Sequence, residues 1–158
     1  MRRYVADTNV FITGWRYYPL RLFADLWSVL DELAHEGSFF TTEVVLDELA
    51  EKNDEIHQWV KARKNHLVRP LTEDTQRIVR EILVRNTSFV RPQRTKQWAD
   101  PFVIAEAKAS AGVVVTYENP RSPERMPAVC QKEGVLCIDM IDFFVDAGIR
   151  FSVSRTVL

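Results

Sequence analysis

The chain has 158 residues, a length that predicts a single domain over residues 1–158 with a core large enough to need no disulfide or structural metal. A formal net charge of −1 excludes nucleic-acid binding through an overall positive charge, but local groups of basic residues leave a basic surface possible. The sequence has no apolar run near the roughly 20 residues of a membrane span and no signal-peptide core. Cys130 and Cys137 lack the spacing of a metal site and read as buried thiols, so we expect a cytoplasmic protein without a membrane segment.

The first dozen residues predict a short buried strand that ends on a carboxylate. An apolar run around Val5 stops at Asp7 and is followed by Thr8 and Asn9. Such a short run of β-branched and aromatic residues favours a strand over a helix. Ligands of parallel α/β sheets bind at the carboxyl ends of the strands, so Asp7 is a candidate functional acid. Asp7 is equally suited to cap a helix or shape a turn.

Helices and strands alternate along the rest of the chain. Apolar residues at helical spacing follow Pro19. Further helices are expected after Thr41 or Thr42, after Asn53 or Asp54, and after Thr72 and Asp139. Further strands are predicted over residues 38–41, 67–71, 113–117 and 135–138, the second of them at a sheet edge because it contains a proline. This order predicts an α/β fold of three layers, α/β/α, around a mostly parallel sheet of about five strands.

Three more acids are expected at the edge of the sheet where Asp7 lies. Glu48 falls on the inward side of its helix, whereas its neighbours Asp47 and Glu51 fall on the outer side. Asp100 precedes a proline at the start of a helix, so helix capping alone would explain it. Glu118 ends the strand predicted over residues 113–117.

Four ionised carboxylates close together need a cation, because like charges raise each other's pKa. Oxygen ligands alone favour Mg²⁺ or Mn²⁺, which bind through a few carboxylates and water. An ion of this kind polarises a phosphoryl group and activates water for in-line attack, so we expect phosphodiester hydrolysis.

Four segments of the chain resemble the ordered motifs of PIN-domain nucleases, which include the VapC-type toxins of toxin–antitoxin pairs. They are residues 5–12 (VADTNVFI), 45–49 (VLDEL), 99–107 (ADPFVIAEA) and 114–118 (VVTYE). The resemblance spans nearly the whole chain. The later run from residue 126 to residue 151 is similar to a less characterised bacterial and archaeal PIN-like branch.

The resemblance implies a metal-dependent ribonuclease with a parallel sheet in the order 3-2-1-4-5. It also implies an RNA substrate, an antitoxin protein as a partner, and a homodimer. The catalytic and metal-binding acids would be Asp7, Glu48 and Asp100, with Glu118 in the fourth position, where many PIN domains have Asp. The resemblance assigns Asn9 and Thr116 supporting roles. Because the side chain of Glu118 is longer than that of Asp, the resemblance leaves two alternatives for the number of metal ions in the site, one or two.

Basic residues are candidates for contacts with the substrate. We expect Arg16, Arg91, Arg94 and Lys96 to bind RNA phosphates, the last three from a loop over residues 86–97 that also has an aromatic residue. The alternatives are a plain connecting loop and basic residues scattered over the surface.

Other functions remain open on the sequence. One is a non-catalytic PIN-like module that binds RNA or protein. Another is phosphoryl transfer through a nucleophilic aspartate, although Asn9 stands where such an enzyme would ordinarily have a second Asp. A serine or cysteine hydrolase has no support, since there is no Gly-x-Ser-x-Gly elbow and His35, His57 and His66 are expected to have surface roles.

Overall fold

The computed structural model describes residues 2–87, 99–117 and 126–158, in which five short strands form one sheet. The strands are β1 (Tyr4–Ala6), β2 (Phe39–Thr42), β3 (Val68–Arg69), β4 (Val113–Val115) and β5 (Cys137–Ile138). They pair in the order β3-β2-β1-β4-β5, and every pair is parallel. The predicted fold class and strand order are thus confirmed. β3 ends before Pro70 and is shorter than the prediction of residues 67–71, because proline has no N–H for the ladder.

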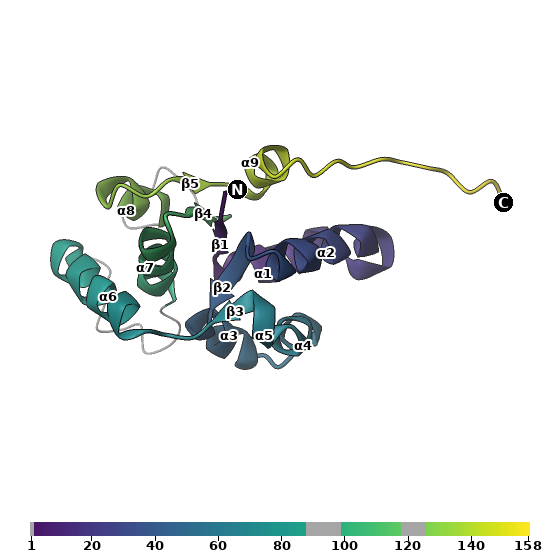
Figure 1. Ribbon diagram of the computed structural model, residues 1–158. Coiled ribbons are helices and arrows are strands. Elements are labelled where there is room, and N and C mark those ends of the chain that lie inside the picture. The colour runs from purple at the N-terminus through teal and green to yellow at the C-terminus, as the bar shows by residue number, and fades with distance from the viewer. Residues whose placement is uncertain (1, 88–98, 118–125) are drawn as a thin grey trace.

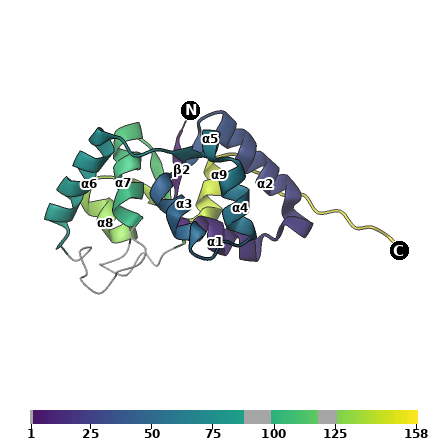
Figure 2. The same cartoon turned by 90° about the horizontal axis from the view of Figure 1, so that it is seen from below.

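Helices cover both faces of this sheet (Figures 1 and 2). Helices α6, α7 and α8 lie on one face, and α1, α2, α3, α4 and α9 lie on the other. Their bounds are α1 Thr8–Tyr17, α2 Leu20–His35, α3 Glu43–Ala50, α4 Glu55–Ala62, α5 Lys64–Leu67, α6 Glu73–Arg85, α7 Asp100–Ser110, α8 Met126–Lys132 and α9 Met140–Asp146. Within the described ranges, none of these helices has the length and apolarity that a bilayer crossing requires.

Helix α1 follows β1 directly, which the sequence analysis did not predict. It buries Val10, Phe11 and Gly14, which recur at a spacing of one and three residues and so fall on one helical face. Pro19 is the N-cap of α2 and separates the two helices. The apolar run that was expected to end at Asp7 therefore continues as a helix whose inner face packs on the sheet.

Side-chain caps begin four of the helices and confirm the caps predicted at Thr72 and Asp139, while Thr42 and Asp54 are the observed caps where the sequence left two candidates each. The side chains of Thr42, Asp54, Thr72 and Asp139 accept hydrogen bonds from backbone N–H groups in the first turns of α3, α4, α6 and α9. Each bond satisfies a donor that the helix itself leaves unpaired.

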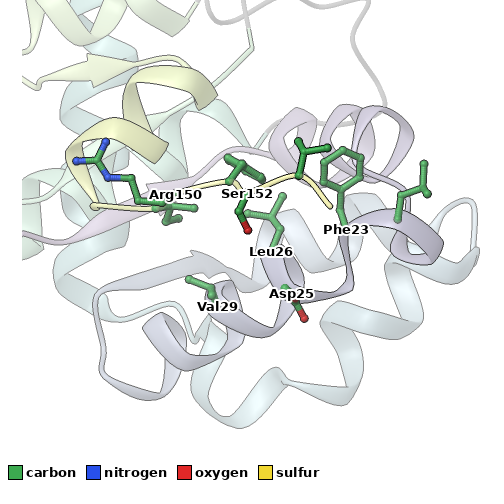
Figure 3. A pocket seen from close by; sticks show the side chains of 10 residues that line it. Phe23, Asp25, Leu26, Val29, Arg150 and Ser152 are labelled. Atoms are coloured by element: carbon green, nitrogen blue, oxygen red, sulfur yellow. The ribbon is translucent and has the colours of Figure 1, made fainter. Parts of the chain in front are cut away.

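The C-terminal tail, residues 150–158, extends away from the helices (Figure 1). Its Phe151 ring packs near Tyr18, Phe23 and Phe144, with centroid separations of 6.3, 6.2 and 5.2 Å, and the residues after it are exposed. A pocket between the start of this tail and α2 is lined by Phe23 and other apolar residues (Figure 3). The pocket contains none of the predicted site residues.

Candidate active site

Asp7 lies at the carboxyl end of β1, between this strand and β4. Its backbone N–H donates to Val115 O at 3.0 Å, which continues the pairing of the two strands. One carboxylate oxygen accepts from Thr8 N at 2.7 Å as the N-cap of α1, and the other accepts from the Thr116 hydroxyl at 3.0 Å. The residue is only 2% exposed. The Asp7 carboxylate thus caps α1 and also lies at the carboxyl edge of the sheet.

Glu48 joins two other parts of this edge. One of its carboxylate oxygens accepts from the Thr8 hydroxyl, and the other accepts from Ala99 N at 2.8 Å. Thr8 follows Asp7, and Ala99 precedes Asp100, so a single side chain holds the neighbours of two predicted site acids. The predicted inward orientation of Glu48 agrees with these contacts. Three segments that are distant in sequence therefore meet at the same edge of the sheet.

Asp100 does not cap α7, which corrects the sequence analysis. The N-cap is Ala99, without a side-chain cap, and Asp100 lies half-buried in the first turn before Pro101. The reason is that Ala99 already has helical backbone angles and that Glu48 of α3 accepts its N–H. The Glu48 carboxylate thus accepts a backbone N–H at the start of α7, where Asp100 was expected to do so.

Asn9 and Thr116 connect the start of α1 to the end of β4. The Asn9 side-chain oxygen accepts from Tyr117 N at 3.0 Å, and it lies 3.3 Å from the Thr116 hydroxyl. Thr116 is 2% exposed and also bonds Asp7. Thr116 thus bonds the Asp7 carboxylate directly, and Asn9 lies beside Thr116.

The acidic edge is electrostatically costly without a cation. Burial raises the pKa of Glu48, while the bonds from Thr8 and Ala99 lower it and the charge of Glu51 adds to the increase. The hydrogen bond to Cys137 and burial raise the pKa of the Cys130 thiol, and the charges of Asp7 and Asp100 add to this. Both aspartates are therefore close enough to act on one buried thiol. No ion pair between described residues involves Glu48.

The donor set of the edge fits Mg²⁺ or Mn²⁺ in chemistry, because it consists of carboxylates and neutral oxygens. In the described parts of the chain, three ligand atoms within 4.8 Å of one another are found at Asp31, His35 and His66, and not at Asp7, Glu48 and Asp100. Mg²⁺ keeps several waters and needs only one or two direct carboxylates. The spread of the three acids is thus compatible with an ion held partly through water.

Several predicted site residues do not enter this geometry. Glu118, Arg91, Arg94 and Lys96 lie outside the described residues. Arg16 is exposed in the last turn of α1, about 12 Å along the helix axis from Thr8 at 1.5 Å per residue.

The basic pair that begins the chain is also remote from the acids. Arg2 precedes β1 at the opposite end of the strand from Asp7, and it pairs with Asp146 at 2.8 Å. The basic groups expected at one edge therefore do not all gather there.

Sequence reasoning missed two groups of residues. Thr8 was given no role, although its hydroxyl is the donor that holds Glu48. The histidines were assigned to the surface, whereas His57 is only 7% exposed and bonds Asn53, and His66 contacts Asp31. The sequence did carry a signal for the pairing of Asp31 with His35, which lie one turn apart on one helix, but none for the contact with His66.

Comparisons with known proteins agree with the fold. The model of a family described as "Domain of unknown function (DUF4411)" matches residues 4–151. A crystal structure of VapBC2 from Rickettsia felis, bound to a DNA fragment from their promoter, is similar with a TM-score of 0.52 and 13% sequence identity. The alignment covers 86% of this chain and 97% of that chain. This likeness shows a PIN-like fold. No curated protein matches the sequence.

Proposed function

This chain belongs to the DUF4411 family, and we propose that it is a divalent-metal-dependent ribonuclease that hydrolyses RNA phosphodiester bonds. We further propose that it is the toxin of a toxin–antitoxin pair, that it acts in the cytoplasm and that it forms a homodimer. The likeness to VapBC2, a complex crystallised with promoter DNA, supports an antitoxin protein as partner.

The observation that carries the proposal is the bridge made by Glu48. Its two oxygens bond the residue after Asp7 and the residue before Asp100, so three acids from three segments are drawn together. Glu133, by contrast, accepts from the basic side chains of Arg85 and Lys108. Glu48 instead accepts from neutral donors, and burial raises its pKa. An edge built in this way is suited to a cation.

Each residue has a proposed role. Asp7, Glu48, Asp100 and Glu118 hold Mg²⁺ or Mn²⁺, directly or through water. Asn9 and Thr116 are positioning residues, since they fix the Asp7 carboxylate. Arg16, Arg91, Arg94 and Lys96 bind RNA phosphates. When bound, the ion supplies the charge that polarises the scissile phosphate and lowers the pKa of an attacking water.

Cleavage of labelled RNA by the purified chain, with and without Mg²⁺ or Mn²⁺, tests this proposal. Asp7→Asn and Asp100→Asn should each lower the cleavage rate by at least about 100-fold, because each removes a charge from the ion's surroundings. Asp25→Asn, which changes an exposed acid of α2, is the matched control and should cleave normally. Circular dichroism checks that all variants fold.

Two results would contradict the proposal. Equal cleavage by the two site variants and the parent chain would exclude these acids. RNA binding without divalent-ion binding or cleavage would assign the chain as a PIN-like binding module.

A further inference from the structure

Asp31, His35 and His66 form a second group of potential metal ligands, away from the acidic edge. Asp31 and His35 lie one turn apart near the end of α2, and His66 comes from α5. One potential ligand atom from each residue lies within 4.8 Å of the other two. His66 Nε2 is 2.7 Å from Asp31 Oδ1, and His35 Nε2 is 4.0 Å from the same oxygen. Two helices thus contribute donors to one small volume.

The chemistry of this group differs from that of the acidic edge. It offers two imidazole nitrogens and one carboxylate, a set that suits Zn²⁺, Co²⁺ or Ni²⁺, whereas carboxylates alone suit Mg²⁺ or Mn²⁺. The two imidazole rings are stacked, with centroids 3.6 Å apart and planes 13° from parallel. Two imidazolium ions at this distance would repel each other, but two neutral imidazoles each have a lone pair to donate to a metal.

We propose that Asp31, His35 and His66 bind a divalent transition-metal ion of the Zn²⁺ type. Three protein ligands and one water complete the tetrahedral coordination that Zn²⁺ prefers. The proposal does not depend on the ribonuclease function, because none of these residues belongs to the acidic edge.

Two of the three ligands are already held in place. The hydrogen bond between His66 Nε2 and Asp31 Oδ1 brings these two ligand atoms together, and the ion would take the place of the proton between them. Arg63 Nε lies 3.3 Å from the same Asp31 oxygen. Arg63 is itself held by Trp59, since it donates to Trp59 O at 3.0 Å and lies over the indole ring at 4.1 Å. The Arg63 guanidinium thus forms an ion pair with the Asp31 carboxylate and helps to keep it in place.

His35 is the ligand that has to move. In the stacked arrangement the nitrogen lone pairs of the two rings run side by side and do not meet at a point. The His35 side chain is 62% exposed, so its ring can turn toward the ion without disturbing the core. We therefore expect the ion to separate the stacked rings.

The bound ion would join the end of α2 to α5, the short helix that leads into β3. An ion that binds only the folded chain raises its apparent stability. We expect Zn²⁺ to raise the midpoint of thermal unfolding and Mg²⁺ not to replace it at this site.

Calorimetric titration with Zn²⁺ in the presence of excess Mg²⁺ tests the proposal. The full chain with Asp7→Asn and Asp100→Asn is used, so that the acidic edge does not compete. This chain should bind one equivalent of Zn²⁺. Adding His35→Ala or His66→Ala should weaken binding by at least about 10-fold and abolish the thermal shift. Glu32→Gln, an exposed acid on the same helix, is the matched control and should change neither.

Co²⁺ absorption gives a second readout, because visible d–d bands of tetrahedral strength should appear in the chain with intact histidines. The proposal is overturned if the chain with all three ligands takes up no Zn²⁺. It is also overturned if the histidine variants bind as tightly as their parent. His35 is exposed, so His35→Ala should fold without metal, which thermal unfolding verifies.

Discussion

Glu48 and Glu133 are both drawn into the protein, yet their surroundings shift their pKa values in opposite directions. Glu133 accepts hydrogen bonds from Arg85, Lys108 and Asn86, and these bonds, that of Arg85 above all, lower its pKa to about 2. Glu48 accepts only a threonine hydroxyl and a backbone N–H among its described hydrogen bonds, and burial raises its pKa.

The opposite pKa shifts indicate different roles: Glu133 stabilises the fold, and Glu48 is suited to binding an ion. Glu133 ties α8 to α6 and α7 and has its charge balanced by two basic side chains. Glu48 has its charge balanced by no ion pair between described residues, although its two oxygens are held in place. A fixed carboxylate at the carboxyl edge of a parallel sheet, with no ion pair to a described residue, supports the proposed metal site.

Glu48→Gln should give the largest effect and should separate these roles. The substitution removes one negative charge from the ion's surroundings, so we expect at least about a 100-fold loss of RNA cleavage. Stability without metal should not fall by more than about 1 kcal/mol, because the lost hydrogen bond is offset by relief of a buried charge. Cleavage assays and urea unfolding measure the two effects. If Glu48→Gln is stable and cleaves RNA as fast as the parent chain, Glu48 does not bind the ion and the contrast with Glu133 fails.

The same glutamate predicts a pH dependence. A raised folded pKa means that the group's contribution to stability is present below its unfolded pKa and is lost as the pH rises through the folded pKa. Protons then compete with the ion, so divalent-ion affinity should fall as the pH drops through the raised pKa of Glu48. Titration with Mn²⁺ at several pH values should show this fall in the parent chain and a weaker one in Glu48→Gln.

Glu133→Gln should have the reverse pattern, with a loss of stability and normal cleavage. Removing a charged partner from a bonded cluster should cost about 2 kcal/mol in free energy of unfolding. A depressed folded pKa adds stability above the unfolded value of 4.5 and loses it as the pH falls toward about 2. Urea unfolding over that pH range should therefore bring the variant and the parent together at the acid end. A constant gap would contradict the assignment.

Thr8→Val should give the smallest effect. It keeps the shape of the side chain but removes the hydroxyl that donates to Glu48. We expect a cost of about 1 kcal/mol in stability and about a 10-fold loss of cleavage, because the Glu48 carboxylate is no longer held. Thr8→Ser, which restores a hydroxyl, should recover most of the cleavage. Failure of serine to do so would assign Thr8 a packing role.

The sequence predicted the parts of the site that depend on local pattern. A short apolar run ending on Asp7 placed that acid at a strand end, and helical periodicity placed Glu48 inward. Both depend only on residues a few positions apart. The order of the strands came from the resemblance to PIN-domain nucleases, because no local pattern specifies which strands pair.

The sequence did not predict contacts between distant segments. Nothing near Ala99 indicates that its N–H is bonded by Glu48, 51 residues away, so Asp100 was assigned as the cap. Helix α1 was not predicted because its first residues, Thr8 onward, belong to the same short motif as Asp7, and this motif was interpreted as the end of a strand. His66 lies 35 residues from Asp31, so only the pairing within α2 was visible in the sequence.

The bond between Thr116 and Asp7 spans 109 positions, and this separation has a consequence for biosynthesis. Asp7 leaves the ribosome 109 residues before Thr116, whose hydroxyl orients it. A truncated product, or a nascent chain stalled before that point, would carry the opening motif in an unassembled form. The proposed cleavage would thus have to wait until β4 and Thr116 have been translated and folded against β1.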